Sequence, residues 1–187
     1  MSRLFLGSVL TAALVAGVAI AAESSTVGLK QGDPIGAFYV TKIAGAEDDG
    51  VKTGQELCYR CKYGQRPMVM VFTRKSSDQV SNLVSELDKA VDKHGDAQLR
   101  AFVTVMGEDQ SSLKSSAKEL AEASKSKKVP VAVASDSQNG PASYRLDPQA
   151  EVTVILANES QVVASHSFKA DGVDSGAVLK EIEQMLQ

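Results

Sequence analysis

The chain has 187 residues, with 20 basic and 23 acidic side chains and a formal net charge of −3. Such mild acidity argues against nucleic acid or an anionic membrane surface as the partner. The two cysteines are too few for a disulfide scaffold, so a hydrophobic core must stabilise the fold.

The first 21 residues have the pattern of an export signal. Arg3 supplies a positive charge, residues 4–20 are almost all apolar and small, and Ala19-Ile20-Ala21 fits an Ala-x-Ala cleavage site. A membrane anchor is the alternative, but the apolar run is at the short limit for a span and no basic cluster follows it. The pattern predicts cleavage near 21/22 and a periplasmic or secreted chain of residues 22–187, with no stable membrane span after cleavage. Its length suits a single domain.

The mature chain begins with a polar stretch, and the first strand is expected at about residues 38–43. An acidic loop with several glycines follows at 46–54, and then comes Cys58-Tyr59-Arg60-Cys61. Residues 67–73 are continuously apolar, as in a central strand covered on both faces. Residues 22–66 therefore form an extension that carries the first strand and the Cys-x-x-Cys segment.

The strongest helix signal follows this central strand. Ser76 is predicted to cap the helix, with Gln79 completing a capping box, and apolar residues then recur at helical spacing at Val80, Leu83, Val84, Leu87 and Val91. Further segments are predicted as a strand at 99–106, a helix at 109–124 and a strand at 129–134. Alternation of strand and helix predicts parallel crossovers.

Two more strands, 152–157 and 161–168, are separated by only three residues, which predicts an antiparallel hairpin. The chain then ends in a helix capped near Asp174. The sequence therefore predicts an α/β fold built on a mixed sheet.

This order resembles the thioredoxin-like superfamily, in particular its redoxin and peroxiredoxin-like branch. The residues that carry the resemblance are Gly32-Asp33-Pro34 with Phe38 and Val40, the central strand at 69–72, Tyr144-Arg145-Leu146, and the closing hairpin and helix. The resemblance implies a thioredoxin-like fold, with a central mixed β-sheet flanked by helices on both faces, in an exported bacterial protein.

The same resemblance implies that the usual active-site cysteines are missing. Counting from Phe72 places Ser77 at the position of the family's catalytic cysteine and Val80 at the second cysteine position. Counting from Tyr144 places Ala150 where the family has a proline, usually cis, with Pro148 two residues earlier. Peroxidase activity is therefore not expected.

Cys58 and Cys61 are the candidate catalytic residues. Arg60, Lys62 and Arg66 surround them, and nearby cations favour the thiolate, which is the reactive form. One hypothesis is thiol–disulfide exchange with another envelope protein that carries a thiol or disulfide. The other is a non-catalytic binding module in which the pair forms a structural disulfide, stapling an irregular segment with few buried apolar anchors.

The sequence predicts no cofactor and no metal. Lys62 stands where covalent c-type haem attachment requires a histidine. A closed zinc site would have to combine the two cysteines with His94 and His166, which are far apart in the sequence. Copper(I) bound by two thiolates stays open as an alternative, because soft ligands suit that ion.

Overall fold

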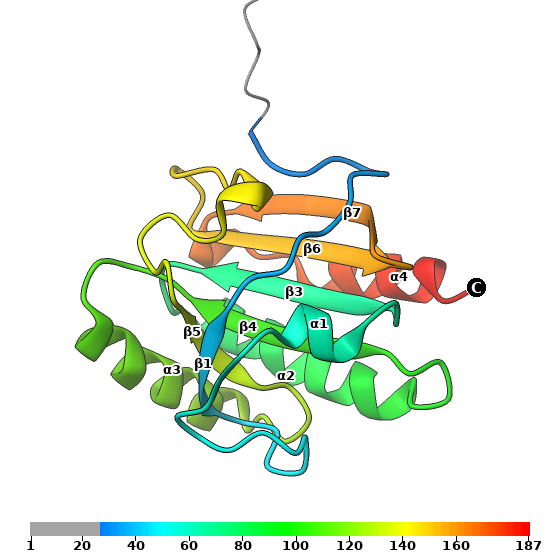
Figure 1. Cartoon of the computed structure of the whole chain (residues 1–187). Helices are drawn as coiled ribbons and strands as arrows, with labels where there is room; N and C mark the ends of the chain where they lie inside the picture. Colours follow the sequence, from blue (N-terminus) through cyan, green and yellow to red (C-terminus); the bar gives the residue numbers. More distant parts are fainter. Residues whose placement is uncertain (1–26) are drawn as a thin grey trace, which may run out of the picture.

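The computed structural model describes residues 27–187, so the export signal predicted at residues 1–21 lies outside the described residues. The strands are β1 Val40–Ala44, β2 Glu56–Leu57, β3 Met68–Thr73, β4 Arg100–Val105, β5 Val131–Ala134, β6 Val152–Asn158 and β7 Gln161–Phe168. The helices are α1 Tyr59–Tyr63, α2 Asp78–Lys93, α3 Gln110–Ser124 and α4 Ser175–Met185, with short 3₁₀ turns η1 Ala142–Tyr144 and η2 Ala170–Gly172 (Figure 1).

All seven strands belong to one mixed sheet in the order β2-β1-β5-β4-β3-β6-β7. The pairs β3–β4 and β4–β5 are parallel, and helices α2 and α3 make the two crossovers between them. The remaining pairs, including the β6–β7 hairpin, are antiparallel. The predicted parallel crossovers and closing hairpin are confirmed.

The central strand β3 explains why the core has two halves. All six of its residues are buried, and successive side chains of a strand point to opposite faces. Val69 and Val71 pack under the long helices, whereas Met68, Met70 and Phe72 pack on the opposite face. The continuous apolar run in the sequence therefore serves both cores.

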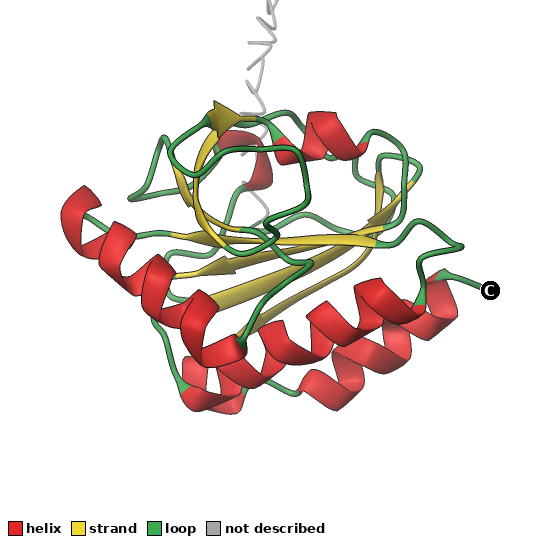
Figure 2. Ribbon diagram, turned by 90° about the horizontal axis from the view of Figure 1, so that it is seen from below, coloured by secondary structure: helices red, strands yellow, loops and turns green. Residues whose placement is uncertain are grey.

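Helices cover both faces, as predicted, but unequally. The three long helices α2, α3 and α4 lie together on one face of the sheet (Figure 2). The other face is covered by α1, η1 and the loops around them, whose Tyr59, Tyr63 and Tyr144 join the second core. This more open face carries the cysteine pair.

The predicted cap of α2 is wrong by one residue. Ser77, not Ser76, is the N-cap residue, and its hydroxyl accepts a hydrogen bond of 3.2 Å from the backbone N–H of Val80. The same hydroxyl donates to the carbonyl oxygen of Ala170, 2.7 Å away in η2. This second bond fixes the start of α2 at Asp78, so no capping box with Gln79 forms.

The other segment boundaries agree with the sequence to within two residues. Asp174 caps α4 as predicted, accepting a hydrogen bond of 2.9 Å from the N–H of Ala177. Glu159 and Ser160 turn the β6–β7 hairpin in the left-handed region, with φ of 51° and 67°. These two residues are enough to reverse the chain, because Asn158, expected in the connection, instead ends β6 and pairs with Gln161.

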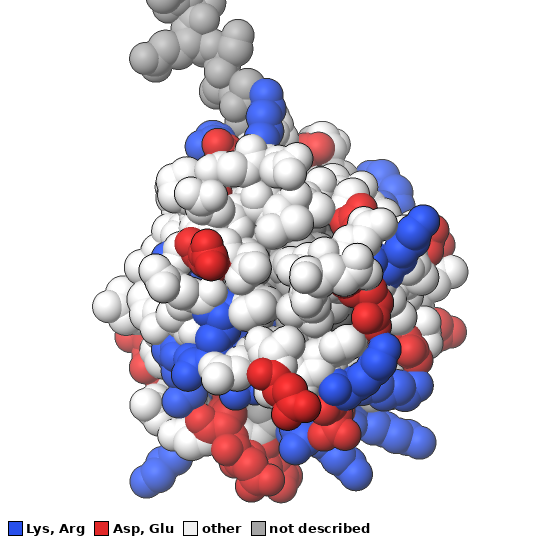
Figure 3. Space-filling model, turned by 90° about the vertical axis from the view of Figure 1, so that its right-hand side faces the viewer, with Lys and Arg blue, Asp and Glu red and all other residues white. Residues whose placement is uncertain are grey.

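Charged side chains are distributed unevenly over the surface. On the face in Figure 3, basic and acidic residues gather together over the lower half, and the upper part is largely uncharged. Within residues 27–187, none of the helices combines the length and the apolar character needed to cross a membrane.

Candidate functional site

The cysteine pair lies on a short helix that the sequence did not predict. Cys58 is the N-cap of α1, Cys61 lies inside the helix, and the two form a disulfide with a Cα–Cα distance of 5.2 Å. The strand β2 precedes them, so the irregular segment expected there is in fact strand followed by helix. One signal for it was present: Tyr59 and Tyr63 are spaced by four residues, as on one helix face.

Gly64 ends this helix. Its φ of 66° lies in the left-handed region, which glycine adopts without the steric cost that a Cβ atom brings. Its N–H donates to the carbonyl oxygen of Arg60 across 3.1 Å and so satisfies one carbonyl at the helix end. Met68, the first residue of β3, follows four residues later, which ties α1 closely to the central strand.

Aromatic packing holds α1 on the sheet. Tyr59 and Tyr63 are 1% and 5% exposed. Their ring centroids lie 5.5 and 6.0 Å from that of Phe102 in β4, and 5.5 Å from each other. The expectation that this segment has few buried apolar anchors is therefore wrong, because two tyrosines anchor it independently of the disulfide.

A buried ion pair lies beneath the helix. The Lys42 ammonium of β1 is 2.7 Å from Oδ1 of Asp49 and also donates to the carbonyl oxygens of Ala46 and Val51. Tyr59 donates its hydroxyl hydrogen to Oδ2 of the same carboxylate across 2.7 Å. Burial, followed by this hydrogen bond, raises the pKa of Tyr59 far above its usual value. The Asp49 network thus joins β1, the 46–54 loop and α1.

The two sulfur-bearing residues differ in accessibility. Cys58 is 8% exposed and its Sγ accepts the backbone N–H of Cys61 across 3.0 Å, whereas Cys61 is exposed. Arg60 precedes Cys61 and donates from Nε to the carbonyl oxygen of Ile35. Lys62 follows Cys61 and is exposed. An incoming sulfur can therefore approach Cys61 more easily than Cys58.

The positions at which the family resemblance implies cysteines are occupied by residues with structural roles. Ser77 is engaged in capping α2 and in binding η2, and Val80 is completely buried. Ala150 lies two residues before β6, and none of the peptide bonds within residues 27–187 is cis. The only described thiol chemistry is thus that of Cys58 and Cys61 on α1.

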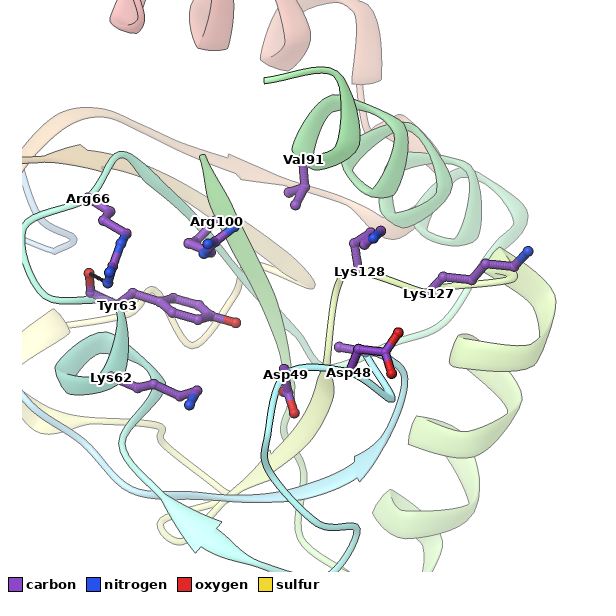
Figure 4. A pocket seen from close by; sticks show the side chains of 10 residues that line it. Asp48, Asp49, Lys62, Tyr63, Arg66, Val91, Arg100, Lys127 and Lys128 are labelled. Carbon is purple, nitrogen blue, oxygen red and sulfur yellow. Dashed lines mark hydrogen bonds between the residues drawn. The ribbon is translucent and has the colours of Figure 1, made fainter. Parts of the chain in front are cut away.

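A pocket of about 390 Å³ lies beside α1 (Figure 4). Five of its side chains are basic: Lys62, Arg66, Arg100, Lys127 and Lys128. Asp48, Asp49, Tyr63, Ala46 and Val91 complete the lining. Sequence reasoning singled out Lys62 and Arg66 only for their closeness to the cysteines, because Arg100 and the 127–128 loop come near them only through the sheet topology.

The two histidines lie apart, each beside a glutamate of α4. Nε2 of His94 is 3.0 Å from Glu183, and Nε2 of His166 is 2.7 Å from Glu181. Hydrogen bonds from Lys93 and His94 lower the pKa of Glu183 below its usual value. Across residues 27–187, no three His, Cys, Asp or Glu residues gather as a metal site would require.

The structure is similar in fold to several solved proteins, two of which are described as thiol–disulfide exchange proteins. A putative thiol:disulfide interchange protein DsbE from Chlorobium tepidum matches with a TM-score of 0.63 and 14% identity, over 85% of this chain and 99% of that one. AhpC from Mycobacterium tuberculosis matches with a TM-score of 0.63 and 11% identity. The thioredoxin domain of a thiol-disulfide oxidoreductase from Bacteroides vulgatus matches with a TM-score of 0.61 and 13% identity. Both matches cover 85% of this chain and 99% of the other chain. No protein-family model and no curated protein matches the sequence. The chain has the thioredoxin-like fold expected from its sequence.

Proposed function

We propose that this thioredoxin-like protein is a thiol–disulfide oxidoreductase whose redox pair is Cys58 and Cys61. The observation that carries the proposal is the disulfide on a surface helix with one exposed and one buried cysteine. Exchange needs an accessible sulfur for the partner and a second sulfur within reach to close the reaction. Both conditions are met on α1, at a position different from that of the family's usual cysteines.

In the oxidising direction, a thiolate of a partner dithiol attacks Sγ of Cys61. A mixed disulfide forms, the Cys58–Cys61 bond breaks, and its electron pair leaves on Cys58 as a thiolate. The second partner thiolate then attacks the partner sulfur in the mixed disulfide and releases Cys61 as a thiolate. The partner is oxidised to a disulfide and this protein is reduced to a dithiol, with two electrons transferred; the reductase direction is the reverse.

The surroundings of α1 favour this chemistry. Arg60 and Lys62 flank Cys61 along the helix, and positive charge stabilises a thiolate relative to the thiol. Cys58 as leaving group would keep the hydrogen bond from the N–H of Cys61, which is 3.0 Å from its sulfur. Hydrogen bonding to the charged form favours that form.

The proposal includes export. A disulfide persists in oxidising compartments such as the bacterial periplasm, which agrees with the export signal expected at residues 1–21. The mature chain of residues 22–187 would then act as one domain on another envelope protein that carries a thiol or a disulfide.

A binding module with a structural disulfide is the second candidate. Ser77 favours it, because the family's usual catalytic position is filled by a hydroxyl that is fully engaged in hydrogen bonds to Val80 and Ala170. In this case Cys58 and Cys61 would only stabilise α1, and the protein would bind a partner without changing its redox state.

The redox equilibrium of the pair separates the two candidates. The mature protein is equilibrated in glutathione or dithiothreitol buffers, and free thiols are labelled. A potential between about −120 and −270 mV, the range of exchange catalysts, supports the oxidoreductase. A potential below about −300 mV, or a pair that does not exchange in the folded protein, supports the binding module. A variant with both cysteines replaced by serine is the control.

A further inference from the structure

We propose that the pocket beside α1 is a binding site for a small anion that carries several phosphate or carboxylate oxygens. The site brings together the Tyr63 hydroxyl from α1, the guanidinium groups of Arg66 and Arg100, and the lysines of the 127–128 loop. Lys62 lies both in this pocket and next to Cys61, but the existence of the site does not depend on exchange at Cys58 and Cys61.

The pocket has an excess of positive charge. Five basic and two acidic side chains line it. Of the two acids, Asp49 is already paired with Lys42 and accepts from Tyr59, so its charge is largely compensated and the cations remain in excess. Within the described residues, Lys62 and Lys127 form no ion pair, and Lys128 has only Asp92 at 3.8 Å. Water-excluding walls and charge of one sign raise the local concentration of an oppositely charged ligand.

The Tyr63 hydroxyl is an unused hydrogen-bond donor inside this pocket. The residue is 5% exposed, and its hydroxyl points toward the middle of the pocket (Figure 4). No hydrogen bond joins it to another residue among 27–187, and because it faces the pocket it can donate to a molecule bound there. Burial, and then the nearby charge of Asp49, raise the pKa of this phenol, so the group keeps its proton to donate. An anionic oxygen bound in the pocket would accept from this donor in a charge-assisted hydrogen bond.

The two arginines are already oriented. Arg66 donates from Nε to Oε1 of Gln98 and from Nη1 to the carbonyl oxygen of Tyr63, across 2.8 and 2.9 Å. Arg100 donates to the carbonyl oxygen of Leu99 across 3.3 Å. Guanidinium groups fixed in this way lose little side-chain entropy on binding, and their remaining N–H groups match phosphate and carboxylate oxygens. The pocket volume of about 390 Å³ suits a small molecule.

Calorimetric titration of the mature protein with pyrophosphate and, separately, with citrate tests the site. Tyr63→Phe keeps the ring and removes only the donor, and Arg100→Gln removes one charge. Because hydrogen bonds between a ligand charge and a protein donor are the strong ones, each change is expected to weaken binding by about tenfold. Lys114→Gln is the control, since it removes the same charge from an exposed position on α3 outside the pocket.

The site is supported if either anion binds and if Tyr63→Phe and Arg100→Gln weaken this binding while Lys114→Gln does not. Tighter binding of pyrophosphate indicates a phosphate ligand, and tighter binding of citrate indicates a carboxylate ligand. Equal weakening by all three variants would mean diffuse attraction and would overturn the proposal. Absence of binding of both anions in the low millimolar range would overturn it as well. Circular dichroism of each variant shows that the fold is kept, and the double Cys→Ser protein is expected to bind unchanged.

Discussion

The hydroxyl of Tyr59 donates to the carboxylate of Asp49 across 2.7 Å, ten residues earlier in the chain. The other oxygen of this carboxylate accepts from the ammonium of Lys42, whose side chain is 3% exposed. The helix that carries the cysteines is therefore joined through one carboxylate to a buried charge in β1. The position of the redox pair depends on a polar network as well as on aromatic packing.

Removal of the shared carboxylate should be strongly destabilising. Asp49→Ala leaves the ammonium of Lys42 buried without its counter-charge, which is expected to lower the free energy of unfolding by about 3–5 kcal/mol. Tyr59→Phe removes only one hydrogen bond and should cost about 1–2 kcal/mol. Urea unfolding measures both, with the exposed neighbour variant Asp48→Ala as control. Equal stability of the Asp48→Ala and Asp49→Ala proteins would contradict the network.

The single-cysteine variants should differ in their capture of a partner. Cys58→Ser keeps the exposed Cys61 and removes the sulfur that resolves the mixed disulfide, so adducts with oxidised glutathione should form readily and accumulate. Cys61→Ser keeps only the buried Cys58 and should form the adduct much more slowly. Mass spectrometry of the intact proteins follows both reactions. Similar rates for the two variants would contradict the assignment of Cys61 as the attacked sulfur.

Two adjacent serines should contribute differently to stability. Ser77→Ala removes the cap of α2 and the bond to Ala170, and a loss of about 1–2 kcal/mol is expected. Ser76→Ala removes neither bond and should change the stability by less than about 0.5 kcal/mol. Neither change should alter the redox potential of the Cys58–Cys61 pair. A shift of the potential in Ser77→Ala would show that the usual family position still takes part in the chemistry.

The protein should lose stability at alkaline pH. Burial raises the pKa values of Tyr59, Tyr63 and Tyr144 in the folded state, whereas an unfolded tyrosine titrates near pH 10. A raised folded pKa gives stability that is complete below the unfolded pKa and is lost as pH rises from there toward the folded pKa. Each group contributes a slope of up to about 1.4 kcal/mol per pH unit above pH 10.

Urea unfolding at several alkaline pH values measures this slope, and phenolate absorbance of the buried tyrosines should rise only as the protein unfolds. Tyr63→Phe should make the slope shallower by the share of one tyrosine. A slope that is the same in this variant would mean that Tyr63 titrates normally in the folded protein.

The long, regular segments could be predicted from the sequence because each satisfies a periodicity on its own. The residues of α2 that pack in the core are at the predicted helical spacing, and β7 has the predicted bounds of Gln161 and Phe168. The helix α1 could not, because its five residues offer only the single spacing of Tyr59 to Tyr63, which is too short a pattern to indicate a helix. Its N-cap is a cysteine, which is not among the residues that favour caps.

The Asp49 network and the pocket depend on contacts between distant segments. Lys42 has the sequence context of an ordinary exposed strand lysine, and its burial follows only from the way the 46–54 loop folds back over β1. Arg100 and Lys128 face the same pocket because β4 and β5 are neighbours in the sheet. Sequence spacing alone does not carry this information.

The aromatic attachment of α1 determines how the two redox forms can be told apart. Tyr59 and Tyr63 pack against Phe102 through contacts that do not involve the sulfurs, so we expect that reduction neither releases the helix nor rearranges the sheet. We expect the oxidised and reduced proteins to share one backbone shape. A partner that distinguishes the two forms must then contact the sulfur of Cys61 itself. No other surface of the molecule would differ between the oxidised and the reduced protein.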